Sequence, residues 1–454
     1  MNPPVDGDGQ QSTVQDRTCR FITLGCKANQ YDTQRVREAM FQAGFREATG
    51  GEAAQVCVVN TCTVTGKADA DGRYEIRKLQ RQNPGARIVV MGCYAARAPM
   101  ELRRMPGGLD VVDAPHRLPE VLASIGVEKL PDGISRFAGH HRAFVKVQDG
   151  CMLDCTFCII PKVRPQLQSR PAEAIEAEVK RLVAAGFREV VLAGIHLGHY
   201  GLDPGSGRPS GRFRLSHLVR RLASVPGVFR IRLSSLDAAE VTEDLIDVVA
   251  TEPRVCPHLH ICLQSGSDAI LAAMRRRYRV AGFLKRIDWI RARLDHPALT
   301  SDVIVGFPGE SEGDFEKTLA VCQAAGFSKI HIFPFSARAG TPAASMTGPV
   351  DQGTIRVRKS RLQVLANQLE ARYYQSVVGQ TLEVLVERIG DGASRSAEGT
   401  ACRYIPVRFH ARPGDEYQLV NVQVTEAHDR EVVGHLIEMR EGANERFMST
   451  HHCD

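Results

Sequence analysis

The chain of 454 residues is long enough for about three domains, and its hydrophobic fraction of 43% is ordinary for a globular protein. A net charge of +6 permits a polyanionic partner without requiring one, and no run approaches the roughly 18 apolar residues that span a bilayer. These values exclude a membrane-spanning chain and a short disulfide-rich secreted domain, so we expect a cytoplasmic protein in which clusters among the thirteen cysteines indicate metal binding or catalysis.

The first predicted domain, residues 18–130, follows a polar leader at residues 1–17 that we expect to be disordered. In this domain, short apolar runs alternate with longer amphipathic segments, a pattern typical of a parallel α/β sheet. The strand-like runs cover residues 20–24, 56–60 and 87–91, and the helix-like segments cover residues 30–43 and 68–82.

Three cysteines follow the predicted strands of this domain, namely Cys26, Cys62 and Cys93, each beside a Gly or Thr. Ligands collect beyond the carboxyl ends of parallel strands, so these thiols are predicted to meet at one sheet edge and bind a cluster. The alternative is that each is a small buried hydrophobic residue. We expect that simpler role for the cysteines at 19, 57, 256, 262, 322 and 402.

The second predicted domain, residues 135–375, repeats the alternation with a longer period. Six βα units predict an open, partial (βα)6 TIM-like barrel rather than the complete eight-unit barrel. The strand candidates cover residues 143–147, 189–193, 229–233, 258–263, 300–305 and 329–334, and helical patterns cover residues 172–185, 240–250 and 311–325.

The most specific motif in the chain is GCMLDCTFC at residues 150–158, which spaces Cys151, Cys155 and Cys158 as CxxxCxxC. Three thiolates on one loop can hold three irons of a 4Fe–4S cluster and leave the fourth iron open to a cofactor. Phe157 favours this interpretation, because an aromatic ring there can pack on an adenine. The alternative is a structural zinc site, with His140 or His141 as the fourth ligand.

Small and polar residues follow the other barrel strands, at the face where TIM-like barrels bind their ligands. Each could be an ordinary βα turn, but their shared location predicts a cofactor pocket. These candidates are Gly194, Ser234, Gln264, Val305 and Gly306. Ser265 and Ser267 add hydroxyl groups and a helix N-cap, while His196 and His199 are either bases or hydrogen-bonded structural residues.

After a basic helical stretch at residues 355–374, short strand-like runs between residues 378 and 440 predict a small all-β barrel. These runs cover residues 381–387, 404–409, 418–424 and 432–436, and a flexible tail is expected at residues 441–454. Several arginines and a lysine could contact nucleic-acid phosphates, the alternative being solvated helix faces. They are Arg275, Arg276, Arg277, Arg338, Arg356, Arg358, Lys359 and Arg361.

The three-part order and several motifs resemble the methylthiotransferase family of radical S-adenosylmethionine (SAM) enzymes over nearly the whole chain. The motifs are LGCKANQYD at 24–32, NTCTVT at 60–65, LQSGS at 263–267 and IVGFPGE at 304–310. The first of them, with RLSSL at 232–236 and MRRRY at 274–278, is most similar to the MtaB-type branch. That branch methylthiolates threonylcarbamoyladenosine at the position 3′ to the tRNA anticodon.

The resemblance implies that Cys151, Cys155 and Cys158 hold the cluster that binds and cleaves SAM. It further implies an auxiliary 4Fe–4S cluster on Cys26, Cys62 and Cys93, a C-terminal TRAM domain, and tRNA as partner. A flavodoxin- or ferredoxin-type protein would supply single electrons to a monomeric enzyme. The segments at 162–170 and 393–402 depart from the family pattern, which affects the substrate contacts expected there.

Three alternatives accompany this interpretation. The substrate could be isopentenyladenosine in tRNA or a ribosomal-protein aspartate, although the run KANQ at residues 27–30 argues against both. The chain could instead be a zinc-dependent RNA-binding protein without catalysis. Finally, the second cluster could serve only electron transfer.

Overall fold

The computed structural model of the chain describes residues 17–203, 213–390 and 395–437, which form two compact units. The first unit comprises the chain up to Gly25, Asp32–Cys62 and Lys67–Pro131, and the second comprises Cys26–Tyr31, Thr63–Gly66 and the chain from Asp132 onward. The expected leader, apart from Arg17, and the expected tail lie outside the described residues. None of the helices in the described ranges is long and apolar enough to cross a membrane.

The first unit contains a five-stranded sheet in the order β2-β1-β3-β4-β5, in which every pairing is parallel. Its strands are β1 (Arg17–Thr23), β2 (Phe45–Glu47), β3 (Val56–Thr61), β4 (Arg87–Gly92) and β5 (Leu109–Val111). The three predicted strands are confirmed, with β1 beginning at Arg17 inside the expected leader. The two edge strands β2 and β5 were not predicted, because three residues are too few to show a pattern.

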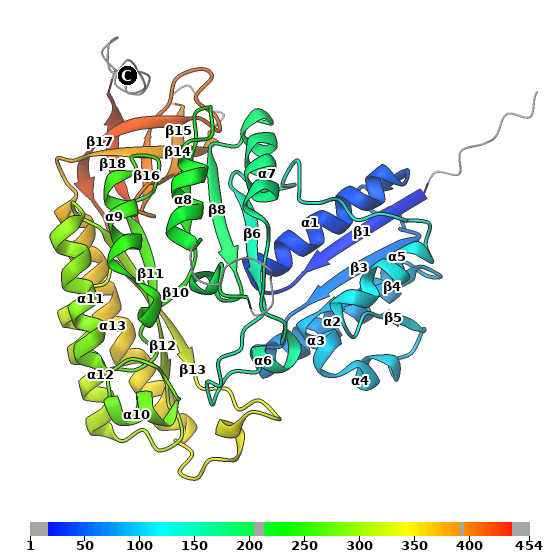
Figure 1. Cartoon of the computed structure of the whole chain (residues 1–454), viewed down its shortest axis with the longest axis horizontal. Helices are drawn as coiled ribbons and strands as arrows, with labels where there is room; N and C mark the ends of the chain where they lie inside the picture. The colour runs from blue at the N-terminus through cyan, green and yellow to red at the C-terminus, as the bar shows by residue number, and fades with distance from the viewer. Residues whose placement is uncertain (1–16, 204–212, 391–394, 438–454) are drawn as a thin grey trace, which may run out of the picture. The chain divides into compact units, whose positions relative to one another are not determined.

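Helices cover both faces of this sheet (Figure 1). They are α1 (Lys27–Gln42), α2 (Gly66–Gln82), α3 (Cys93–Arg97), α4 (Pro99–Arg103) and α5 (Leu118–Ala123), with a 3-10 turn at Pro115–Arg117. Val58 and Val89 pack with residues of α1 and α5, whereas Val59 and Val90 pack with residues of α2 and α4. Central strands of a parallel sheet are buried on both faces, which explains why all six residues of β3 are buried.

The core of the second unit has six parallel strands, as predicted. They are β6 (Ala143–Asp149), β8 (Glu189–Gly194), β9 (Arg230–Leu233), β11 (His258–Cys262), β12 (Ala298–Val305) and β13 (Lys329–Pro334). Two short strands, β7 (Gln168–Ser169) and β10 (Leu236–Asp237), complete sheets ordered β7-β6-β8-β9 and β10-β11-β12-β13. Between the two sheets, the Ile231 N–H donates to the Arg254 carbonyl oxygen at 2.7 Å. The Ile231 carbonyl oxygen accepts from the Cys256 N–H at 2.8 Å.

Eight helices accompany these strands in the described part of this unit, and α11, α12 and α13 lie side by side along β11–β13 (Figure 1). They are α6 (Ile160–Val163), α7 (Ala172–Ala184), α8 (Leu215–Ala223), α9 (Glu243–Thr251), α10 (Asp268–Ala273), α11 (Val280–Arg293), α12 (Glu312–Ala325) and α13 (Gln352–Ser376). The 3-10 turns are Leu197–His199, Ala238–Glu240 and Pro342–Ser345. Helix α9 begins three residues later than predicted, because Thr242 caps it by accepting from the Leu245 amide at 3.2 Å.

The C-terminal strands form a closed barrel in the order β14-β15-β16-β18-β17. They are β14 (Thr381–Ile389), β15 (Ser396–Ala401), β16 (Pro406–His410), β17 (Leu419–Ala427) and β18 (Val432–Leu436). The all-β barrel is confirmed, but β15 was missed. It lies in the divergent segment, where small residues give no strand pattern. A Cβ on Gly399 would lie 2.4 Å from the Leu385 carbonyl oxygen, so glycine there permits the close approach of β15 to β14.

A buried ionic network joins this barrel to the core of the same unit. Glu189 on β8 accepts from Arg230 at 2.7 Å and from Arg232 at 2.8 Å, and all three side chains are at most 3% exposed. The remaining N–H groups of Arg230 donate to the carbonyls of Glu383 and Thr400, each at 2.8 Å. Each buried arginine thus has the Glu189 carboxylate as a counter-ion and backbone carbonyls as acceptors, which offsets the cost of burying its charge.

Candidate metal centre

The loop that carries the CxxxCxxC motif begins at a glycine immediately after β6. Gly150 has φ = 78°, in the left-handed region, and a Cβ there would lie 1.9 Å from the Gln166 carbonyl oxygen. Only glycine satisfies both conditions. The chain therefore turns sharply at the carboxyl end of β6, and residues Cys151–Cys158 follow this turn.

Backbone hydrogen bonds fix this loop to segments distant in the sequence. The Cys151 amide donates to Arg164 O at 3.1 Å, and the Thr156 amide donates to Met274 O at 3.2 Å. The Thr156 hydroxyl adds a bond to Ala273 O at 2.9 Å. The loop is thus held at both ends before any metal binds.

The three thiols of the loop have the donor chemistry of an iron–sulfur site. All twelve cysteines within the described ranges are free, so none of these thiols is lost to a disulfide. Burial raises the pKa of Cys158 to about 12 and also raises the pKa of Cys151, which keeps them protonated without metal. Coordination to iron reverses this preference, because a metal ion stabilises the thiolate. The residues present therefore fit a 4Fe–4S cluster with three protein ligands.

Phe157 lies partly buried against a hydrophobic cluster that includes Met274 and Phe307. The two histidines considered as zinc ligands pack on aromatic rings instead. The His140 ring centroid lies 4.7 Å from that of Phe137, and the His141 ring stacks on Tyr417 at 4.9 Å.

Gln148 is a buried residue that belongs to none of the sequence motifs, and it ties the loop to the segment that follows β8. Its amide nitrogen donates to the Asp149 carbonyl at 2.6 Å and the Gly150 carbonyl at 2.7 Å. Its amide oxygen accepts from the His196 backbone amide at 2.7 Å. A buried glutamine that satisfies three backbone groups can be recognised only once the strand ends are assembled.

Replacing Gln148 by leucine is expected to destabilise the metal loop. The backbone groups of Gly150 and His196 would lose partners, at roughly 1–3 kcal/mol for each buried group left unpaired. We expect a lower melting temperature together with lower iron content after anaerobic reconstitution. The exposed Gln166→Leu variant is the control, and equal iron and stability in both variants would contradict this role.

The candidates after the second and third barrel strands lie at strand ends, as predicted. A Cβ on Gly194 would lie 3.0 Å from Leu197 Cα and 3.1 Å from Gln148 Oε1, so packing within the protein leaves little room for a side chain here. The Ser234 amide donates to Leu192 O at 3.0 Å, and its side chain is half-buried. These residues border the edge that carries the cysteine loop.

The segment after the fourth strand differs from the expectation of free hydroxyl groups. Gln264 adopts φ = 63° and is half-buried, but Ser265 and Ser267 are fully buried. Ser267 occupies the N-cap position of α10 without capping it, because its hydroxyl donates to Asp314 at 2.6 Å. A Cβ on Gly266 would lie 2.5 Å from Thr318 Cα. This part of the motif therefore packs the loop against α12.

The end of the fifth strand is also fixed by packing. Val305 is fully buried, and Gly306 has φ = 81° with Ile355 of α13 only 2.4 Å from where a Cβ would lie. The Gly306 amide donates at 2.8 Å to Glu310, whose carboxylate also pairs with Arg358 at 2.9 Å. Glycine is thus needed here for the backbone turn and for the close approach of α13.

His196 and His199 are hydrogen-bonded residues of a buried network. Both Nε2 atoms lie close to Glu240 Oε1, at 2.7 and 2.9 Å, and Arg277 reaches the same oxygen at 2.6 Å. Burial opposes ionisation of Glu240, but these hydrogen bonds lower its pKa to about 2. Both histidines thus have a hydrogen-bond partner, as the structural alternative expects.

The three upstream cysteines follow adjacent strands of the first sheet. Cys62 and Cys93 come directly after Thr61 and Gly92, which are paired in register. A Cβ on Gly92 would lie 2.3 Å from Asn60 Oδ1, so glycine lets the ends of β3 and β4 approach closely. Cys26 comes three residues after β1 and is exposed. Strands β1, β3 and β4 are adjacent in the sheet, so the carboxyl ends that precede these cysteines in the chain are neighbours.

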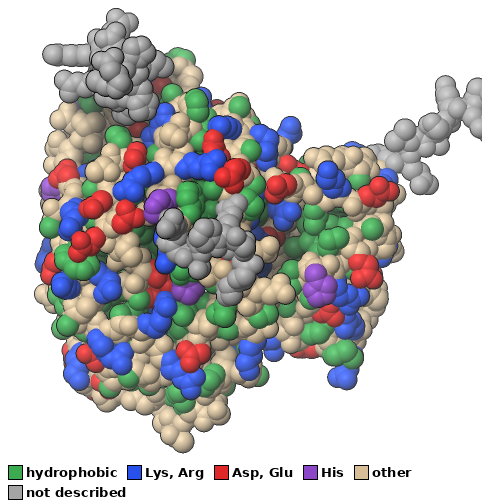
Figure 2. Space-filling model, in the orientation of Figure 1, with side chains coloured by type: hydrophobic (Ala, Val, Ile, Leu, Met, Phe, Trp, Pro, Cys, Tyr) green, Lys and Arg blue, Asp and Glu red, His purple; other side chains and the backbone are tan. Residues whose placement is uncertain are grey.

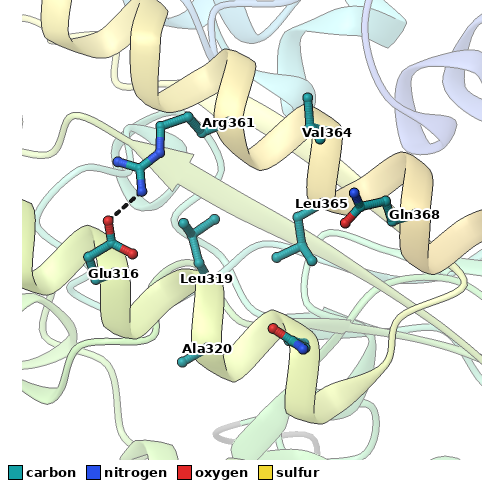
Figure 3. A pocket seen from close by; sticks show the side chains of 8 residues that line it. Glu316, Leu319, Ala320, Arg361, Val364, Leu365 and Gln368 are labelled. Atoms are coloured by element: carbon teal, nitrogen blue, oxygen red, sulfur yellow. Dashed lines mark hydrogen bonds and ion pairs between the residues drawn. The ribbon is translucent and has the colours of Figure 1, made fainter.

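Several predicted phosphate contacts are wrong, because their charges are used inside the protein. The side chains of Arg276 and Arg358 are 7% and 5% exposed and pair with acidic residues, and Arg338 is also buried. Arg361 is paired with Glu316 at the rim of a groove between α12 and α13 (Figure 3). Cationic and anionic side chains are interspersed on the face in Figure 2.

Two family profiles match the chain. Residues 18–113 match "Uncharacterized protein family UPF0004", and residues 145–322 match the "Radical SAM superfamily". Among solved structures, the radical SAM methyltransferase TsrM from Kitasatospora setae aligns with a TM-score of 0.53 at 13% identity. The alignment covers 72% of this chain and 77% of that one, and it supports the fold alone.

Curated relatives extend over most of the chain. The threonylcarbamoyladenosine tRNA methylthiotransferase MtaB of Chlamydia pneumoniae is 40% identical over 82% of this chain and 87% of its own length. MtaB of Bacillus subtilis (strain 168) is 39% identical over 82% and 85% of the two chains. The tRNA-2-methylthio-N(6)-dimethylallyladenosine synthase of Mycolicibacterium paratuberculosis is 38% identical over 90% and 84%.

Two matching profiles and relatives of this similarity, added to the cysteine loop at the barrel edge, settle the family. The chain belongs to the radical SAM tRNA methylthiotransferases, whose cofactors are SAM and two 4Fe–4S clusters.

Proposed function

We propose that this chain transfers a methylthio group to C2 of N6-threonylcarbamoyladenosine beside the anticodon of tRNA. The observation that carries the proposal is its similarity to three MtaB relatives, at 35–40% identity over 82% of the chain. The motif LGCKANQYD at residues 24–32 supports the same branch. The substrate is therefore assigned by relatedness, and the chemistry by the cysteine loop.

The residues of the barrel edge would bind and orient the first cofactor set. Cys151, Cys155 and Cys158 would hold the SAM-binding cluster, whose open iron supplies reductive SAM cleavage and hence radical chemistry. Phe157, Gly194, Ser234, Gln264, Val305 and Gly306 would surround SAM. No acid–base side chain can activate an aromatic C–H bond, so the protein positions the groups and excludes water.

The upstream cysteines would hold the auxiliary cluster. Cys26, Cys62 and Cys93 follow adjacent strands of one parallel sheet, where ligands commonly bind. In this proposal the transferred sulfur would be bound at the cluster that these cysteines hold. A flavodoxin- or ferredoxin-type reductant, a monomeric enzyme and a cytoplasmic location complete the proposal.

The RNA would be recognised outside a duplex. An adenosine in the anticodon loop can be extruded into a pocket without breaking base pairs. The exposed Arg356 and Lys359 on α13, together with the C-terminal barrel, would contact the RNA backbone.

A dimethylallyladenosine in tRNA is the second candidate substrate. Synthases named for that nucleoside are 35–38% identical to this chain over 90–93% of its length. Both nucleosides must therefore be followed in one assay.

Deleting the gene is expected to remove 2-methylthio-threonylcarbamoyladenosine from total tRNA, as measured by nucleoside mass spectrometry. Wild-type protein should restore the modification, whereas the Cys155→Ala variant should restore none, because the cluster would lose one of three ligands. Cys322→Ala is the matched control, since Cys322 is buried on α12 in the hydrophobic core. Its expression should restore the nucleoside.

The pattern of loss distinguishes the two substrates. Disappearance of only the methylthio derivative of dimethylallyladenosine would replace the first substrate by the second. Full rescue by Cys155→Ala would overturn the role of the loop in catalysis. If both nucleosides persist after deletion, the tRNA assignment fails.

A further inference from the structure

Cys155 has a buried cationic partner that its sequence neighbourhood does not reveal. Arg276, 121 residues away, donates from Nη1 to Cys155 Sγ at 3.3 Å. Both residues are within the second unit, and the Arg276 side chain is only 7% exposed. A guanidinium in this position is therefore directed at a thiol that the proposed function assigns to the cluster.

Arg276 is held in place by contacts independent of the cysteine. Its Nη2 donates to Asp237 at 2.6 Å, and the Asp237 side chain is 4% exposed. Its Nε donates to the Tyr278 hydroxyl at 3.3 Å. The Arg276 amide donates to Leu271 O at 2.8 Å, which fixes the backbone after α10. Arginine's planar fork suits this arrangement, because each edge meets a different partner.

Cys151 has a partner of similar construction. His196 Nδ1 lies 3.5 Å from Cys151 Sγ, while its Nε2 lies 2.7 Å from the buried Glu240. Two of the three thiols thus contact a buried nitrogen-bearing side chain that a carboxylate holds from behind. Carboxylates that orient the residues around a metal site commonly tune the metal.

Hydrogen bonds to cluster sulfurs help set the reduction potential of iron–sulfur clusters. When a 4Fe–4S cluster changes from its 2+ to its 1+ state it gains one electron, and negative charge on the thiolates increases. A nearby guanidinium stabilises that extra charge, and low exposure keeps water from screening it. Loss of the guanidinium therefore disfavours the reduced state.

We propose that Arg276, oriented by Asp237, is a positioning residue that raises the reduction potential of the cluster held by Cys151, Cys155 and Cys158. This inference rests on the proposed function of those cysteines. One electron enters from a low-potential reductant, and no bond or proton need change. Arg276 therefore affects how readily the cluster accepts the electron that SAM cleavage requires.

The test is a redox titration of the full-length chain in a triple alanine background, Cys26→Ala, Cys62→Ala and Cys93→Ala, so that only one cluster is observed. Anaerobically reconstituted protein without SAM is reduced by dithionite through dye mediators, and electron paramagnetic resonance measures the reduced fraction. For Arg276→Met we expect the reduction equilibrium constant to fall about tenfold, a shift of about 59 mV to more negative potential.

Two further variants separate this role from a merely structural one. Arg276→Lys keeps the charge and should restore part of the shift. Arg275→Met is the neighbouring control. The Arg275 side chain is 53% exposed and pairs with the Asp154 carboxylate, so the cluster of this variant should have an unchanged reduction potential.

Each outcome decides a different claim. If the background protein binds no cluster after reconstitution, the assignment of the loop fails and the inference fails with it. If the cluster is present and Arg276→Met leaves its potential unchanged, only the inference fails. Should Arg276→Met lose its cluster, Arg276→Gln decides, because it removes the charge but keeps a polar side chain: normal iron content with an unshifted potential overturns the proposal.

Discussion

Replacing Glu189 by glutamine is expected to lower the free energy of unfolding by about 3–5 kcal/mol, because it leaves buried arginines without their buried counter-ion. Glu189 is fully buried and pairs with Arg230 and Arg232, whose other N–H groups bind carbonyls of the C-terminal barrel. Loss of the carboxylate weakens the interface as well as the pair. We therefore expect the barrel to become the first part of the second unit to open.

Chemical denaturation and limited proteolysis would measure this effect. Glu383→Gln is the matched control, since Glu383 also pairs with Arg230 but its side chain is 42% exposed. A carboxylate this exposed is solvated without its partner, so its removal should cost about 1 kcal/mol or less and this variant should resemble wild type. Equal stability of the two variants would contradict a dominant role for the buried network.

The pH dependence has a defined sign. Burial opposes ionisation of Glu189, but Arg232 and Arg230 overcome it and hold its pKa below the ordinary value. Its contribution is therefore fully present above the usual glutamate pKa, about 4.3, and is lost as pH falls toward the lower folded-state pKa. The stability gap between wild type and Glu189→Gln should narrow in that acidic range.

Replacing Gly150 by alanine is expected to remove most of the iron bound by the cysteine loop. The left-handed φ of 78° costs about 1–3 kcal/mol for a residue with a Cβ. In addition, the Cβ would lie 1.9 Å from the Gln166 carbonyl oxygen, so the backbone beside Cys151 must move. Iron and sulfide content after reconstitution, in the triple alanine background, measures the result.

Gly186→Ala separates conformational strain from the steric clash. Gly186 has φ = 97°, and a Cβ there meets nothing within 4 Å. This variant should lose a similar amount of stability through strain while retaining its iron. Retention of full iron by Gly150→Ala would show that the loop can adjust, and the proposed requirement for glycine would fall.

Much of the fold could be predicted from the sequence, because its signals are local. The alternation of strands and helices fixed the parallel sheets, and strands β3, β4, β6, β8 and β13 begin at the predicted residue. Strands β2, β5, β7, β10 and β15 were missed, since short or small-residue segments become strands only by pairing with neighbours. The CxxxCxxC loop carries its chemistry within nine residues.

The glycine-containing strand ends show where this local reasoning stops. Gly194 and Gly306 were considered as parts of a cofactor pocket, yet at both positions another part of the chain lies close to where a Cβ would be. Gln148 was overlooked, because its hydrogen bond with the His196 amide, 48 residues away, forms only after β6 and β8 pair. Packing against distant segments cannot be inferred from spacing.

The run of arginines at 275–277 shows most clearly the difference between what the sequence determines and what the tertiary structure decides. By sequence the three are equivalent basic residues, but their side chains are 53%, 7% and 45% exposed. Sequence alone determined the family motifs, the alternating architecture and the six candidate cluster cysteines, because spacing along the chain encodes them. Only the tertiary structure decided that Arg276 faces Cys155 and Asp237, because those contacts join residues 121 and 39 positions apart.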